Sequence, residues 1–221
     1  MIYGDPMVDD LDAETLVRLS LLGEIETQCQ WALDRLETIR EKVKEVTTTS
    51  FVDGNRARWF RARDDTFASV QSFLTGASIV DSIVTGRGPP RPKGMPRVSE
   101  STRRWLREQL GVGPDFEIGG RVQRNSLIHI EERLIPWSKP GGMRGDFAIT
   151  SIGVTDDAVL KQTLRALDPK TLQFAVVGET CSLGEVEKSL ILIAEAARRV
   201  VRATLDGVNT TSQSSDSSPP S

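Results

Sequence analysis

The spacing of apolar residues between positions 22 and 46 constrains the fold more than any other feature of this chain. Apolar side chains recur at alternating intervals of three and four residues: Leu22, Ile25, Cys29, Ala32, Leu36, Ile39, Val43 and Val46. This interval places all of them on one face of an α-helix. We expect the helix to begin near Asp12 or Ala13 and to end in the threonine run at 47–49, because β-branched residues are poor helix formers. Its long apolar face needs a partner.

A second helical pattern supplies that partner between Asn55 and about Thr85. Its apolar positions are Phe60, Phe67, Val70, Leu74, Ala77 and Val84. The connection at 47–54 has the usual length for neighbouring helices, so an antiparallel helical hairpin is expected. The following segment, 86–96, is rich in proline and glycine and reads as a solvated loop, with a Pro-rich peptide-recognition segment as the alternative. Its cations, including Arg91 and Lys93, are candidate phosphate contacts.

Two further helices are expected before position 137. Ser99 is a plausible N-cap for a helix through Leu110 that turns Trp105, Leu106 and Leu110 inward. The next helix opens near Gly120 and is closed by Pro136. Its apolar residues are Val122, Leu127, Ile128, Ile130 and Leu134.

The pattern becomes strand-like after residue 142. Residues 146–153 read as a strand, and 160–167 with 171–178 read as a hairpin around Asp168-Pro169-Lys170, although 159–167 could instead form a short helix. Ser182 and Glu185 match a capping box that opens a last amphipathic helix to about Leu205. The expected fold is mainly α: one helical-bundle domain over 1–206, a β-hairpin or meander inserted at about 146–178, and a disordered Ser/Thr/Pro-rich tail at 207–221.

Composition limits the function classes. The formal net charge of −3 argues against a broad electrostatic grip on nucleic acid but leaves room for a local basic cleft. The two cysteines suggest neither a disulfide framework nor a metal site, and we expect them to be small buried hydrophobes. We find no charged-then-apolar leader and no apolar run near 18 residues, so a cytoplasmic protein without a membrane span is expected.

The residues most suited to chemistry are Arg124, Asn125 and His129, the last being the only histidine in the chain. An imidazole moves protons near neutral pH, a guanidinium grips phosphate, and an amide orients either group. Five positions along a helix correspond to about 7.5 Å of rise and about 140° of rotation, so Arg124 and His129 do not share a face. A second copy of the motif could complete the site. The alternative is a partly buried helix histidine with satisfied ring nitrogens.

This arrangement resembles the HEPN superfamily, whose members are compact α-helical bundles and often ribonucleases. The family motif is an arginine, then four to six residues that begin with Asn, Asp or His, then a histidine; Arg124, Asn125 and His129 fit it with four intervening residues. The resemblance covers about residues 12–137 and the final helix. The stretch from Glu131 to Leu134, with Trp137, also resembles a branch of uncharacterised bacterial members.

The resemblance implies metal-independent cleavage of RNA by attack of the ribose 2′-hydroxyl, without a cofactor, leaving a 2′,3′-cyclic phosphate and a 5′-hydroxyl. His129 would move the proton, Arg124 would stabilise phosphate charge, and Asn125 would orient the imidazole or donate to a phosphate oxygen. Further candidate substrate contacts are Glu131, Glu132, Arg133 and Trp137. One subtype, paired with nucleotidyltransferase antitoxins, has a tyrosine two residues after the histidine. Position 131 is glutamate here, so regulation by nucleotide attachment at that position is not expected.

Three interpretations remain open at this point. The first is a HEPN-type ribonuclease acting as a toxin or antiviral defence factor, as a homodimer, with RNA as substrate and an antitoxin or other protein as partner. The second is a non-catalytic, dimeric HEPN-like interaction module, which the acidic net charge favours. The third is an unrelated helical protein with a chance motif. The presence of both Arg124 and His129 favours the enzyme.

Overall fold

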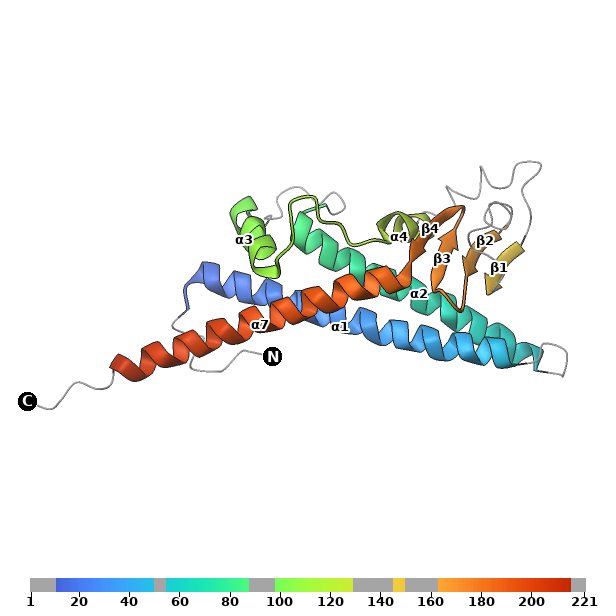
Figure 1. The fold of residues 1–221 in the computed structure, drawn as a ribbon, viewed down its shortest axis with the longest axis horizontal. Helices are drawn as coiled ribbons and strands as arrows, with labels where there is room; N and C mark the ends of the chain where they lie inside the picture. Colours follow the sequence, from blue (N-terminus) through green and yellow to red (C-terminus); the bar gives the residue numbers. More distant parts are fainter. Residues whose placement is uncertain (1–10, 50–54, 88–97, 129–144, 150–162, 216–221) are drawn as a thin grey trace, which may run out of the picture.

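Three long helices run along the length of an elongated molecule that carries a small sheet at one end (Figure 1). A computed structural model describes residues 11–49, 55–87, 98–128, 145–149 and 163–215. The elements in chain order are α1 (Ala13–Thr48), α2 (Arg56–Thr85), α3 (Glu100–Leu110), α4 (Arg121–Ile128), β1 (Gly145–Ile149), β2 (Thr163–Leu167), β3 (Gln173–Val176), β4 (Glu179–Ser182) and α7 (Leu183–Ser215). The predicted mainly helical class, with antiparallel strands before the C-terminal helix, is confirmed.

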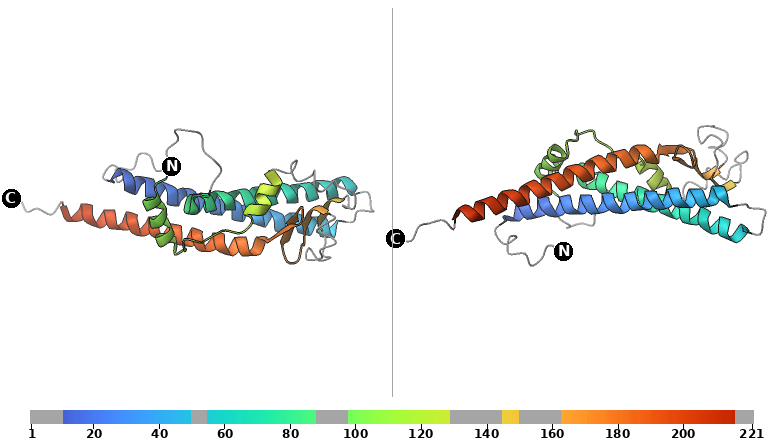
Figure 2. Two further views of the ribbon diagram at one scale, coloured as in Figure 1. Left: turned by 90° about the horizontal axis from the view of Figure 1, so that it is seen from above. Right: turned by 60° about the horizontal axis from the view of Figure 1, so that its bottom comes forward.

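Helices α1 and α2 form the predicted antiparallel hairpin, which all views show as two helices side by side (Figures 1 and 2). Every apolar residue of the 22–46 repeat is buried. Helix α1 begins where the sequence predicts, because the Asp12 carboxylate accepts hydrogen bonds from the backbone N–H groups of Glu14 and Thr15. At the start of α2, by contrast, Asn55 makes no side-chain capping bond and the first turn holds no acid.

Helix α7 covers a second face of α1. Ion pairs of 2.7 Å join the two helices, between Arg40 and Glu187 and between Arg198 and Glu26. Ser182 caps α7 as predicted by accepting from the Glu185 N–H at 3.2 Å, but the Glu185 carboxylate pairs with Lys188 instead of completing the box.

The sequence predicted that the last helix ends near Leu205 and that a disordered tail begins at Gly207. This prediction is wrong for residues 207–215, because α7 continues to Ser215. Extending an existing helix fixes one residue per added hydrogen bond, so helix-poor residues can join a helix that is already nucleated.

Strands β2, β3 and β4 form an antiparallel meander, and β1 lies parallel to β2 at the sheet edge. The β2–β3 hairpin is as predicted, and the alternative of a short helix is wrong for 163–167. The turn between them is held by the Asp168 side chain, which accepts from the backbone N–H groups of Lys170 and Thr171.

Strand β4 was not predicted. The sequence pattern indicated that the last strand ends at Gly178, whereas a two-residue turn at Val177 and Gly178, both with positive φ, returns the chain into β4. The four residues of β4 are ETCS, which lack the apolar alternation by which strands are recognised.

Helix α3 crosses the other end of the bundle. Ser99 accepts the Thr102 N–H as the predicted N-cap, and Leu106 and Leu110 are buried. Trp105 is only partly buried, with the Arg18 guanidinium 4.9 Å from its ring centroid.

Among the described residues, α2 alone is long and apolar enough to cross a bilayer by length and composition. The sequence pattern had indicated no such apolar run. In the structure, 56% of the most apolar window of α2 is buried inside the protein, so packing against α1 accounts for its composition.

Candidate functional site

Helix α4 carries Arg124 and Asn125, and a glycine determines where it lies. Gly120 adopts φ +90° and its Cα faces the buried Leu74 of α2; a Cβ at this position would come within 2.6 Å of the leucine Cδ2. The Gly120 carbonyl then accepts the Arg124 N–H at 2.8 Å and closes the first turn. Only glycine tolerates both the backbone angle and this approach. The start of α4 is therefore fixed against α2.

A buried amide fixes the other side of α4. Gln123 is 5% exposed, and its Nε2 donates to the carbonyl oxygen of Thr180 in β4 at 2.7 Å. The sequence pattern placed Val122 on the apolar side of this helix, which is wrong: Val122 is 47% exposed, while the neighbouring glutamine faces inward. The reversal has a physical reason, because β4 presents a carbonyl that a buried amide can satisfy and a valine cannot.

Arg124 and Asn125 are brought together by a hydrogen bond from the arginine Nη1 to the asparagine Oδ1, 3.1 Å long. Both side chains are partly buried. Among the described residues, the buried Arg124 Nε has no hydrogen-bond partner and no carboxylate pairs with this guanidinium. The arginine is thus oriented by a neutral amide, and no described acid compensates its charge, which suits an anionic ligand.

The remaining predicted site residues lie outside the described residues. These are His129, Glu131, Glu132, Arg133, Trp137, Arg91 and Lys93. Of the predicted constellation, the structure therefore describes Arg124 and Asn125, and these two are in contact.

Sequence reasoning missed two residues that hold this region in place, Gln123 and Asp81. Asp81 of α2 is 1% exposed and accepts the N–H of Ile118 at 3.2 Å, which ties the segment leading to α4 to the hairpin. A carboxylate inside the apolar repeat of α2 was the available signal, because buried acids are almost always paired.

Neither cysteine offers a reactive thiolate. Burial, with a smaller contribution from Glu26, raises the pKa of Cys29 to about 12. Burial alone raises the pKa of Cys181 to about 12. Both thiols are free, and Cys181 is only partly buried by area. Within the ranges that the structure describes, no group of three His, Cys, Asp or Glu side chains is placed to hold a metal ion.

Comparisons of this chain with protein-family models, with curated proteins and with solved structures find no match.

Proposed function

We propose that this protein is a HEPN-type, metal-independent endoribonuclease that cleaves RNA by attack of the ribose 2′-hydroxyl. The observation that carries the proposal is the state of Arg124: its guanidinium is oriented by Asn125, its Nε has no partner among the described residues, and no described carboxylate neutralises it. The same helix leads in sequence to His129, the only imidazole in the chain.

The proposed chemistry divides between these three side chains. His129 transfers a proton to or from the reacting oxygens, which is the role of a group with a pKa near neutrality. Arg124 stabilises the negative charge that grows on the phosphate, and Asn125 keeps the planar fork of the guanidinium pointed at it. The products are a 2′,3′-cyclic phosphate and a 5′-hydroxyl.

We further propose a two-fold homodimer that brings two copies of the motif to one cleft. On a continuous helix, residues five apart are rotated by about 140°, so the spacing in the sequence predicts that a single copy of the motif separates Arg124 from His129. In a two-fold dimer the same surface of each subunit forms the interface, so Arg124 of one subunit can lie next to His129 of the other. The biological role that fits such an enzyme is a toxin or antiviral defence factor in the cytoplasm, controlled by an antitoxin or another partner protein.

The test compares purified wild type with Arg124→Ala, His129→Ala and a control, Arg199→Ala, on end-labelled single-stranded RNA in EDTA. Arg199 is exposed on α7 and provides the matched loss of one positive charge. Both motif variants are expected to lose cleavage by about 10²–10⁴-fold, the usual contribution of a positioned proton-transfer or charge-stabilising group. The control should retain wild-type activity.

The product ends decide the mechanism. A cyclic phosphate, which resists a phosphatase until it is opened by acid, supports 2′-hydroxyl attack. If wild type cleaves no faster than His129→Ala, or if cleavage needs a divalent metal, the enzyme proposal fails. A non-catalytic dimeric interaction module is then the better description.

A further inference from the structure

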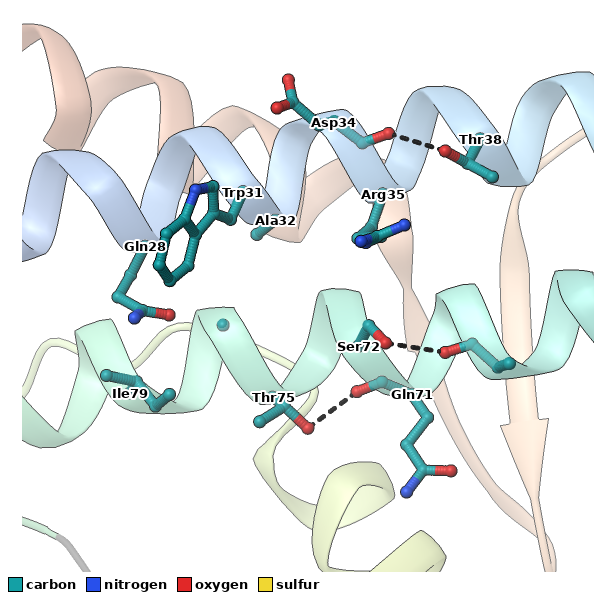
Figure 3. Close-up of a pocket in the computed structure, with 12 residues that line it drawn as sticks. Gln28, Trp31, Ala32, Asp34, Arg35, Thr38, Gln71, Ser72, Thr75 and Ile79 are labelled. Atoms are coloured by element: carbon teal, nitrogen blue, oxygen red, sulfur yellow. Dashed lines mark hydrogen bonds between the residues drawn. The ribbon is translucent and has the colours of Figure 1, made fainter.

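A groove of about 710 Å³ lies between α1 and α2, away from α4 (Figure 3). On α1 it is lined by Trp31 and Arg35, one helical turn apart. These residues lie on the opposite side of α1 from Glu26 and Arg40, which pair with α7. The groove therefore belongs to a face of the hairpin that α7 does not cover.

Small residues form the floor of the groove, where the two helices approach closely. Gly76 of α2 lies against Ala32 of α1, so closely that a Cβ on the glycine would be 3.1 Å from the alanine Cβ. The wall on α2 consists mainly of short or polar side chains, among them Gln71, Ser72 and Thr75. This leaves room for a flat ring between the helices.

Trp31 is the largest apolar side chain that faces this space, and 60% of it is exposed. Figure 3 shows its indole reaching from α1 over the groove. An indole left in water on a polar surface forgoes the free energy of its burial, about 25 cal/mol per Å² of apolar area. The exposed face of this indole is therefore available for a ligand to stack on.

Arg35 stands four residues further along α1, about 6 Å by helical rise. It is exposed and makes no hydrogen bond or ion pair within the described structure, unlike Arg18, Arg40 and Arg198, which are paired with acids. Figure 3 shows both the guanidinium and the indole directed from α1 toward the space between the helices, where one can hold a phosphate while the other stacks on a base.

The polar groups of the groove complement a base edge. Thr75 and Ser72 donate their hydroxyl hydrogens to carbonyls of their own helix, at 2.8 and 3.0 Å, so toward the groove they act as acceptors. An apolar ligand would leave these groups unsatisfied.

We propose that this groove binds a nucleotide of single-stranded nucleic acid, with the base stacked on Trp31, the phosphate held by Arg35 and the base edge facing the Ser72 hydroxyl. The inference rests on the proposed function only in taking RNA as the polymer. In Figure 3 α4 lies on the side of α2 away from α1, so the groove is a site separate from Arg124 and would anchor a strand whose cleavage takes place elsewhere.

The test measures fluorescence anisotropy of a labelled 12-nucleotide RNA in which every ribose is 2′-O-methylated, because this probe cannot undergo 2′-hydroxyl attack. Trp31→Ala should weaken binding by about 5- to 100-fold, the usual effect of removing one stacking partner. Trp31→Phe keeps an aromatic face and should recover most of the affinity. Arg35→Ala should weaken binding and flatten its dependence on salt concentration.

Matched controls are Leu192→Ala, which removes a 67% exposed apolar residue from α7, and Arg199→Ala. Circular dichroism establishes that each variant is folded. Wild-type affinity in Trp31→Ala and Arg35→Ala, equal losses in the controls, or no binding by wild type would each overturn the inference. If binding depends on Trp31 but the protein never cleaves unmodified RNA, the groove is a nucleotide-binding site and the ribonuclease proposal is wrong. If the protein cleaves RNA but its binding of RNA does not depend on Trp31, the ribonuclease proposal stands and the groove proposal is wrong.

Discussion

Replacement of Gly120 by alanine is expected to loosen α4 and with it the candidate site. Two costs add at this position. A non-glycine residue at φ +90° is strained by about 1–2 kcal/mol. The new Cβ would also come within 2.6 Å of the Leu74 Cδ2, and such overpacking of a core costs about 1–3 kcal/mol. The free energy of unfolding should therefore fall by about 2–5 kcal/mol.

Two other glycines separate these costs. Gly111 has φ +69° and open space where a Cβ would lie, so Gly111→Ala should show the strain alone, about 1–2 kcal/mol. Gly23 lies within α1 with nothing within 4 Å of an added Cβ, and Gly23→Ala should stabilise the protein by about 0.5–1 kcal/mol.

Urea unfolding followed by circular dichroism measures all three variants. With a slope of about 2–3 kcal/mol per molar urea, Gly120→Ala should move the midpoint down by roughly 1–2 M. The Arg124 N–H donates to the Gly120 carbonyl, so a shift of the backbone at position 120 would also move Arg124. RNA cleavage by Gly120→Ala should therefore be slower than by wild type in an assay without urea, at a temperature where the variant is folded. A Gly120→Ala midpoint no lower than that of Gly111→Ala would refute the proposed contact with Leu74.

Four further outcomes are expected. Burial raises the pKa of Asp168, but hydrogen bonds from Lys170 and Thr171 outweigh burial and hold the pKa below 3.8. The ionised carboxylate therefore contributes its full stabilisation of the fold above pH 3.8, and this contribution is lost as the pH falls through the lower pKa of the folded state. Asp168→Asn should cost about 1 kcal/mol at pH 7 in urea melts and nothing at a pH below the folded pKa. Cys29 and Cys181, with pKa values of about 12, should react with iodoacetamide at pH 8 only after unfolding, as mass spectrometry would show; rapid native labelling would contradict this. Asn125→Ala should reduce cleavage by about 10- to 100-fold, less than His129→Ala, in single-turnover assays. Sedimentation at micromolar concentration should give a dimer, and a monomer alone would count against the shared cleft.

Those elements whose apolar spacing is regular were predicted well from the sequence. The hairpin follows from the repeat in α1, all of whose members are buried, and its start follows from the Asp12 cap. Regular spacing is informative because burial of one helix face is decided by the helix itself, before any partner is known.

Features that depend on a distant partner could not be predicted in the same way. Gln123 is buried because β4 offers the Thr180 carbonyl, and no sequence pattern indicates that pairing across 57 positions. Strand β4 itself is recognised only through its register with β3. In the candidate site, the motif singled out Arg124 and Asn125, which are in contact in the structure, but the glycine, glutamine and aspartate that position their helix come from tertiary contacts.

The ion pairs between α1 and α7 connect residues that are 147 and 172 positions apart. During synthesis, α1 and α2 can pair as soon as both have left the ribosome, because their contacts are local along the chain. The face of α1 that α7 covers stays open until the rest of the described chain has been made. The nascent protein thus displays an unfinished apolar surface for most of its translation, and this is the interval in which a chaperone or a second nascent chain would meet it.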